Sequence, residues 1–146
     1  MNNPAMIIKE LKTENEWRDA FPIMQQLRTH LDKASFLKLV KEAKEMENYQ
    51  LVSLYDDGKM VAVVGFMPML TLYHGKFVWV CDLVTDSTVR SKGYGKILLS
   101  YVHDWAKEHD FRIVSLSSNL QRVDAHRFYE HKMEYDKVSY VFLKRV

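Results

Sequence analysis

Two turn signals separate three apolar stretches in the middle of the chain, and this pattern constrains the fold more than any other. The stretches span residues 49–55, 60–72 and 76–84, and their apolar, β-branched and aromatic content is typical of strands. Residues 56–59 (DDGK) and 74–75 (HG) provide the two turns. Strands joined by hairpins pair in antiparallel fashion. The sequence therefore predicts an antiparallel sheet built from these stretches.

Helical and strand-like patterns flank this sheet. Thr13 and Glu16 match a capping box, and residues 17–27 follow with helical spacing, although Pro22 favours a kink or a break. Further helices are expected over residues 35–46, 95–109 and 121–131, and further strands over residues 6–12, 111–117 and 138–143. The β-α-β connection across residues 77–117 requires a parallel pair. The expected fold is therefore α/β (α+β), with a mixed, mostly antiparallel central sheet flanked by about four helices.

Length and composition exclude several classes of protein. The 146 residues suit one domain, which we expect to span residues 6–146 after a short tail of residues 1–5. A net charge of +2 argues against a nucleic-acid partner. The single cysteine, Cys81, cannot form an internal disulfide, and no Cys/His spacing predicts a metal site. The longest apolar stretch is interrupted, and no signal peptide is recognisable, so we expect a cytoplasmic protein without a membrane partner.

Glycine is scarce in this chain, which makes its placement informative. Two of the five glycines, Gly93 and Gly95, lie in residues 90–96 (RSKGYGK), between an expected strand and an expected helix. The amides at a helix N-terminus bind anions, and this segment adds three basic side chains. The spacing matches neither a P-loop nor a Rossmann fingerprint. Two interpretations stay open, a pyrophosphate site and a helix start with solvated lysines. Gly65, inside a strand, is expected to relieve crowding.

A second segment, residues 125–130 (AHRFYE), combines core-type residues with a tyrosine. Ala125 and Phe128 share one helical face and are expected in the core. Tyr129 lies at a helix–sheet junction, where a tyrosine is often only a packing residue. Its phenol, with an ordinary pKa of about 10, can also protonate a leaving thiolate. Both interpretations of Tyr129 stay open on the residues alone.

Together, these two segments resemble the GNAT superfamily of acetyl-CoA-dependent N-acetyltransferases. Residues 90–95 are similar to the family's R/Q-x-x-G-x-G/A loop, and residues 125–135 to its A-x-x-(F/L)-Y-E-x-x-G-F motif. Residues 82–85 (DLVT) resemble, in slightly shifted register, the family's (E/D)-L-x-V strand. The motifs follow in the family's order, and the expected order of elements matches the family over essentially the whole chain.

The resemblance implies acetyl-CoA as co-substrate and assigns roles to particular residues. The main chain at Leu83 and Val84 would pair with the pantetheine arm like an added strand and hold the acetyl carbonyl. Tyr129 would be the general acid that delivers a proton to the CoA sulfur. Asn119 would either touch the pantetheine arm or only cap a helix. The CoA pyrophosphate would be held by the backbone of Arg90, Ser91, Lys92, Gly93, Tyr94, Gly95 and Lys96.

Asp82 is the candidate general base, because it lies on the strand that leads to the glycine loop. A carboxylate on a mostly apolar strand must find a partner or line a cleft. Strict alternation would place Asp82 on one face with Val80 and Val84, and Cys81 with Leu83 on the other. The alternatives are a purely structural carboxylate at Asp82 and a water molecule as the base.

The sequence departs from the family pattern at two places. Arg122 stands three residues before the motif alanine, where the family often has Asn. Glu134 and Tyr135 replace the usual Gly-Phe after the helix, which leaves the turn geometry there open.

The resemblance implies an N-acetyltransferase that acts on a primary amine of a small molecule or peptide by direct attack in a ternary complex. The alternatives are a non-catalytic acyl-CoA-binding sensor or interaction module of the same fold, and a small nucleic-acid-binding domain. Selection of the acceptor is expected from residues 27–44, 67–74 and Trp79. A homodimer, formed through the closing strand or a sheet edge, is a further expectation.

Overall fold

The computed structural model describes residues 5–90 and 92–146. The chain divides into two compact units, the first ending at Ser115 and the second beginning at Leu116. The first unit contains, in order, β1 (Met6–Glu10), α1 (Glu14–Leu27), α2 (Lys33–Glu47), β2 (Gln50–Asp56), β3 (Lys59–Thr71), β4 (Gly75–Thr85), the 3-10 helix η1 (Ser87–Val89) and α3 (Tyr94–Glu108). Strand β5 (Val114–Leu116) crosses the division, and the second unit holds α4 (Val123–Arg127) and the π-helix η2 (Phe128–Lys132).

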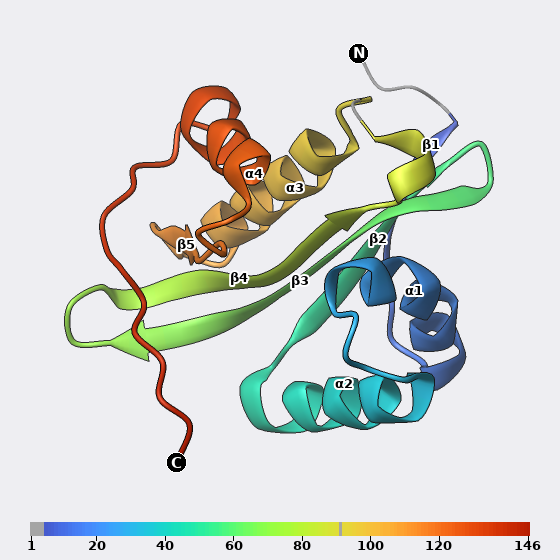
Figure 1. Ribbon diagram of the computed structural model, residues 1–146, viewed down its shortest axis with the longest axis horizontal. Coiled ribbons are helices and arrows are strands. Elements are labelled where there is room, and N and C mark those ends of the chain that lie inside the picture. Colours follow the sequence, from blue (N-terminus) through green and yellow to red (C-terminus); the bar gives the residue numbers. More distant parts are fainter. Residues whose placement is uncertain (1–4, 91) are drawn as a thin grey trace. The chain divides into compact units, whose positions relative to one another are not determined.

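The strands form one sheet in the order β1-β2-β3-β4-β5 (Figure 1). The pairs β1–β2, β2–β3 and β3–β4 are antiparallel, as the two turn signals predict. Asp57 and Gly58 at the first turn, and Gly75 at the second, have positive φ angles. Helix α3 connects the neighbouring strands β4 and β5, which is the connection of a parallel pair. The mixed sheet and the single-domain α/β class are therefore confirmed.

Helices cover both faces of the sheet in the first unit. Helices α1 and α2 lie against one face, and α3 lies against the other (Figure 1). The core on the α1–α2 face includes Trp17, Phe36 and Val63, all buried. On the α3 face, Phe66 of β3 packs edge-on against Trp105, with 5.1 Å between ring centroids. No helix in the described parts of the chain has the length and apolarity needed to cross a bilayer.

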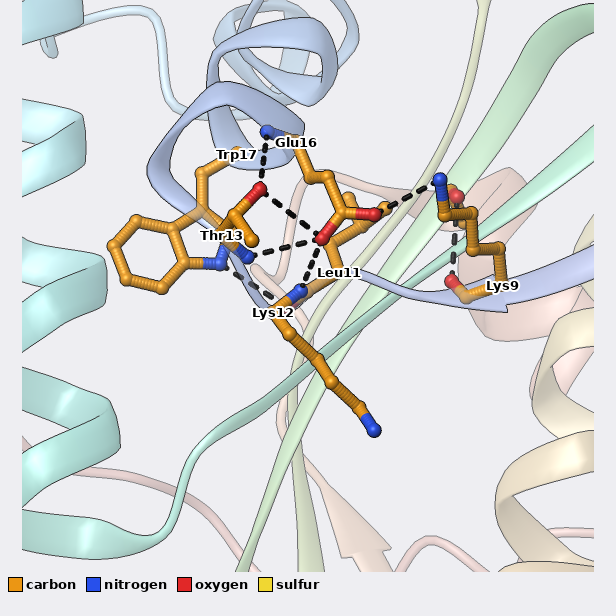
Figure 2. A network of polar contacts seen from close by, with 7 residues as sticks. Lys9, Leu11, Lys12, Thr13, Glu16 and Trp17 are labelled. Carbon is orange, nitrogen blue, oxygen red and sulfur yellow. Dashed lines mark hydrogen bonds and ion pairs between the residues drawn. The ribbon is translucent and has the colours of Figure 1, made fainter.

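The start of α1 is fixed by the predicted capping box (Figure 2). The Glu16 carboxylate accepts hydrogen bonds from the backbone N–H groups of Lys12 and Thr13, at 2.9 and 3.0 Å. It also forms an ion pair with the Lys9 ammonium at 2.8 Å. The contact with Lys9, followed by those with the two amides, lowers the pKa of Glu16 to about 2. The helix therefore begins at a site whose polar groups are nearly all satisfied locally.

The break expected at Pro22 does not occur, because α1 runs without interruption from Glu14 to Leu27. Proline at position 22 removes the helical hydrogen bond to the Arg18 carbonyl, and both residues are exposed. Buried Phe21 and Ile23 on either side of the proline fix the helix against the sheet.

The closing strand expected over residues 138–143 is wrong. These residues have no regular secondary structure, and the large apolar side chains of Val138, Tyr140 and Phe142 are exposed. Apolar residues report a tendency to be buried, whereas a strand requires hydrogen bonds to a neighbouring backbone. The apolar residues of this segment indicate a tendency to be buried, but the sequence does not specify which strand would pair with the segment.

Candidate active site

The loop between β4 and α3 ends at a helix start without a side-chain cap. Gly93 is the N-cap of α3, has φ +81° and ψ 10°, and makes no capping bond. Nothing lies within 4 Å of a Cβ built there, so the glycine is required by its left-handed conformation and not by crowding. The first amides of α3 therefore have no side-chain acceptor from their N-cap, which suits an anion.

The first residue of α3 anchors the start of this helix to the sheet. Tyr94 is buried, and its Oη donates to Asp56 Oδ2 at 2.5 Å, which joins the start of α3 to the end of β2. Arg90, Lys92 and Lys96 expose their cationic side chains on the same segment. Ser91, expected in the pyrophosphate site, lies outside the described residues. The start of α3 is thus anchored to the end of β2, and exposed positive charge lies beside it in the sequence.

Strand β4 presents its main chain along one edge beyond the reach of β5. The Val78 N–H donates to the Ile113 carbonyl at 2.9 Å, so β5 begins beside the first half of β4. Strand β5 has only three residues, too few to extend to Leu83 and Val84. Both residues pair with β3 on the other side. In the described part of the first unit, no strand pairs with this edge of β4 at Leu83 and Val84.

A β-bulge interrupts β4 immediately before this edge. Gly65 pairs with Asp82, but the next residue of β3, Phe66, pairs with Val80, so Cys81 has no counterpart. Val80 therefore shares the α3 face with Phe66, whereas Cys81 packs against the core on the α1–α2 face. The strict alternation that grouped Val80 with Asp82, and Cys81 with Leu83, is wrong, because the extra residue reverses the alternation.

The Asp82 side chain lies between two donors from distant parts of the chain. Arg28 Nε donates to its Oδ1 at 2.9 Å, and Tyr49 Oη donates to its Oδ2 at 2.7 Å. Arg28 Nη2 also donates to the Cys81 carbonyl at 2.7 Å. Burial, with the negative charge of Asp82, raises the pKa of Tyr49 well above its usual range. Tyr49 is therefore a neutral hydroxyl donor, and Asp82 is a paired carboxylate.

Gly65 accommodates this cluster, as its expected role in relieving crowding suggests. A Cβ at Gly65 would lie 1.8 Å from Tyr49 Oη and 2.8 Å from Asp82 Oδ2. Sequence reasoning identified Asp82 and Gly65 but missed Arg28 and Tyr49. The glycine inside a strand was the available signal, because it marks a close approach of other groups.

Cys81 carries no nucleophilic role in this arrangement. Burial, and then the nearby charge of Asp82, raises the pKa of its thiol to about 12. The thiolate form is therefore negligible at neutral pH. Among the described residues, no group of His, Cys, Asp and Glu side chains is arranged to hold a metal ion.

In the second unit, Tyr129 lies in the π-helix η2 and is only 8% exposed. The Met133 N–H donates to the Phe128 carbonyl at 3.1 Å, five residues back, and the Tyr135 N–H donates to the Tyr129 carbonyl at 2.9 Å. Burial raises the pKa of Tyr129, and Arg122 partly opposes this. The phenol therefore keeps its proton at neutral pH, as a proton donor must.

The π-helix explains the departure at Glu134. Counted from Ala125 without a gap, the motif places its glycine at residue 133, so one additional residue is needed before Glu134 takes the glycine's place. The left-handed residue is Glu134, with φ +59°. A π-helical turn contains an extra residue relative to an α-helical turn, which moves the turn one residue along the chain. The left-handed turn therefore forms without glycine, at a cost in backbone strain.

Asn119 and Ser118 precede this helix. Asn119 Oδ1 accepts a bond from the Gln121 N–H at 3.0 Å, which is a local turn contact. Ser118 Oγ is buried and has no hydrogen-bond partner in the described parts of the chain. A buried hydroxyl without a partner fits a site that a polar ligand completes.

Among the described residues, the structure thus combines a mixed sheet, a helix start without a side-chain cap, and an edge of β4 that β5 leaves unpaired at Leu83 and Val84. Residues 11–135 match the acetyltransferase (GNAT) family. The chain belongs to this family, and it is an acetyl-CoA-dependent acyltransferase. It is 44% identical over 139 residues to the uncharacterized N-acetyltransferase YhdJ of Bacillus subtilis, covering 95% of this chain and 98% of that protein.

Solved structures share the fold. The aminoglycoside N-acetyltransferase AAC(6')-Iy, solved in complex with CoA, has a TM-score of 0.84 and 13% identity, with 97% of this chain and 94% of that chain covered. A transcriptional regulator from Bacillus halodurans has a TM-score of 0.79 and 24% identity, with 97% and 99% covered. At these identities, the likeness concerns the fold.

Proposed function

We propose that the protein transfers the acetyl group of acetyl-CoA to the primary amine of a small molecule or peptide, by direct attack in a ternary complex. The uncapped start of α3 behind Gly93 carries this proposal, because it offers main-chain donors and positive charge to a pyrophosphate. Family membership supports acetyl transfer in general.

Three groups of residues would hold acetyl-CoA along its length. The main chain at Leu83 and Val84 would bind the pantetheine arm as an added strand. Asn119 would contribute a polar contact to the same arm. The pyrophosphate would be held by Arg90, Ser91, Lys92, Gly93, Tyr94, Gly95 and Lys96.

The chemistry needs an acid and a base from the protein or from water. Acetyl-CoA supplies an acetyl group activated as a thioester. The amine nitrogen bonds to the acetyl carbon, the carbon–sulfur bond breaks, and Tyr129 gives its phenolic proton to the sulfur. Asp82, directly or through a water molecule, takes the proton that the amine loses. The phenolate then regains a proton from solvent.

The contacts of Asp82 are compatible with this base role. Each of its oxygens accepts one bond, from Arg28 or from Tyr49, and keeps a second lone pair. The side chain is 14% exposed, so water can reach it. A water-mediated transfer requires no rearrangement of the two donors.

The acceptor amine would bind on the same sheet face as Asp82. Met67 and Trp79 face each other across β3 and β4, both partly exposed, and alternation from Gly65 places them on the face of Asp82. Residues 27–44 would contribute the opposite wall. These side chains would set the preference for the non-reacting part of the acceptor.

We also propose that residues 6–146 form one catalytic domain after the tail of residues 1–5, acting in the cytoplasm without metal, nucleic acid or membrane. A homodimer would cover the exposed apolar side chains of residues 138–143.

Two measurements test the function. CoA and acetyl-CoA should raise the melting temperature, since a ligand that binds only the folded state stabilises it. Tyr129→Phe should lower kcat on a panel of amines by about 10²- to 10⁴-fold, with the Kd for CoA nearly unchanged. Tyr140→Phe, at an exposed tyrosine of the same unit, is the matched control.

The outcomes separate the alternatives. No thermal shift at millimolar CoA would contradict the proposed function. CoA binding without turnover of any amine would favour the non-catalytic sensor. Turnover that survives Tyr129→Phe would remove Tyr129 as the acid.

A further inference from the structure

The last turn of α1 and the residue after it contact β4 and its following loop on both sides of Leu83 and Val84. On one side, Arg28 binds the Asp82 carboxylate and the Cys81 carbonyl, at 2.9 and 2.7 Å. On the other side, the Gln26 carboxamide accepts from the Ser87 N–H at 2.8 Å and donates to Asp86 Oδ1 at 3.3 Å. The proposed acyl-binding segment thus lies between two attachments to a single helix end.

The Arg28 contact is directed at the β-bulge itself. A bulged residue is left out of the regular ladder, so its main chain needs other partners to keep one conformation. Arg28 Nη2 satisfies the carbonyl of the bulged Cys81, while its Nε holds the next side chain along the strand. Arg28 is also the C-cap of α1, and its N–H donates to the Met24 carbonyl at 2.9 Å.

Tyr49 completes the arrangement from the opposite side. It is buried, and its hydroxyl holds the second oxygen of Asp82. With both carboxylate oxygens bound, the Asp82 side chain cannot rotate without breaking a charge-assisted bond. The conformation of β4 at residues 81–82 is thereby set by two side chains 54 and 33 residues away from Asp82.

We propose that Arg28, assisted by Tyr49, is a positioning residue for acetyl transfer. Arg28 fixes the β4 bulge so that the main chain at Leu83 and Val84 meets the thioester in the reactive geometry. This inference rests on the proposed function, since it assigns to Arg28 the alignment of the edge that binds acetyl-CoA. It predicts an effect on turnover that is separable from binding and from stability.

The variants are chosen to separate the two contacts of the guanidinium. Arg28→Met keeps the length of the side chain and removes every donor. Arg28→Lys keeps the charge but replaces the planar pair of donors by one ammonium group. Tyr49→Phe removes only the hydroxyl. Arg18→Met, at an exposed arginine of the same helix, is the matched control.

For Arg28→Met, kcat per folded molecule should fall about 100-fold, because small displacements of the reacting groups have effects of that size. The Kd for acetyl-CoA should stay within about threefold, since the pyrophosphate contacts are intact. Amide hydrogen exchange at Leu83 and Val84 should become faster. Arg28→Lys should recover part of kcat, and Arg28→Lys with Tyr49→Phe should be non-additive, because both hold one carboxylate.

The results that would overturn the proposal are equally distinct. Arg28→Met with an unchanged kcat per folded molecule removes the positioning role, even if its melting temperature falls. Amide hydrogen exchange at Leu83 and Val84 that is unchanged in Arg28→Met also removes the positioning role. If Arg28→Met does not fold, Arg28→Lys and Tyr49→Phe decide by these same criteria. A wild-type protein that binds no acetyl-CoA overturns the proposed function itself, whereas normal wild-type turnover with unaffected variants overturns only the role of Arg28.

Discussion

The two ends of α1 each involve a carboxylate, but the two carboxylates are held in different ways. At the start of the helix, Glu16 accepts bonds from the backbone N–H groups of Lys12 and Thr13 and pairs with Lys9. At the other end, Asp82 is held by side chains alone, those of Arg28 and Tyr49. The first group of contacts is exposed, and the second is partly buried.

Glu16 makes local contacts within one segment of the chain, whereas Asp82 makes tertiary contacts between distant segments. The contacts of Glu16 join residues at most seven positions apart, so they stabilise the helix start wherever the helix lies. The contacts of Asp82 join the residue after α1 and the residue before β2 to β4, so they fix where one strand lies relative to a helix end. Loss of the first should therefore cost stability only, and loss of the second should also cost catalytic geometry.

Gly65→Ala should have the largest effect on stability, because its Cβ would overlap Tyr49 Oη at 1.8 Å. Tyr49 must then move, which breaks its bond to Asp82 and disturbs a buried cluster. We expect a loss of about 1–3 kcal/mol in the free energy of unfolding, measured by urea denaturation. The kcat per folded molecule should fall as well.

The role of Tyr49 in this loss of stability is tested by removing the Tyr49 side chain. In a Tyr49→Ala background, Gly65→Ala should cost much less stability than in the wild type, because the added methyl group then occupies vacated space. Equal costs in the two backgrounds would show that the backbone at residue 65 or the Asp82 carboxylate, 2.8 Å from the added Cβ, and not Tyr49, opposes the side chain.

The parts of the fold that local chemistry determines were predictable. The turns at residues 56–59 and 74–75 and the capping box at Thr13 all formed as the sequence indicates. The continuity of α1 through Pro22 was not predictable, because it depends on what lies on either side of the proline after packing. The strand expected over residues 138–143 failed for a related reason, since the sequence does not identify its neighbour.

In the candidate site, too, local features were predictable and tertiary contacts were not. The left-handed Gly93 and the buried Tyr129 were predictable, because each belongs to a short motif whose residues lie close together in the sequence. The partners of Asp82 could not be found in this way, because no periodicity relates residues 28, 49 and 82. The bulge at Cys81 also changed which residues of β4 share a face, so that Val80 and Asp82 lie on opposite faces. In the sequence, only Gly65 indicated that other groups approach the strand closely there.

Thr13→Ala should have a smaller effect, confined to stability. Its hydroxyl caps α1 by accepting from the Glu16 N–H at 3.3 Å. Removing such a cap costs about 1 kcal/mol of unfolding free energy. Thermal and urea denaturation should show this loss, with kcat per folded molecule equal to that of wild type. Thr29→Ala, at an exposed threonine after α1, should change neither quantity. A fall in kcat would mean that the two ends of the helix are coupled.

Glu16→Gln should have the smallest effect and should be visible mainly in its pH dependence. Contacts with Lys9, and then with the two backbone amides, lower the pKa of Glu16 from 4.5 to about 2 in the folded protein. The wild-type carboxylate therefore stabilises the fold above pH 4.5, and this contribution is lost as the pH falls from 4.5 towards 2. Glutamine does not titrate, so the difference in melting temperature between the two proteins should shrink over that same range. Because the pair with Lys9 is exposed, added salt should reduce the difference at neutral pH. A difference that stays constant from neutral pH down to pH 2 would instead assign the role of Glu16 to hydrogen bonds that its amide reproduces poorly, and not to its charge.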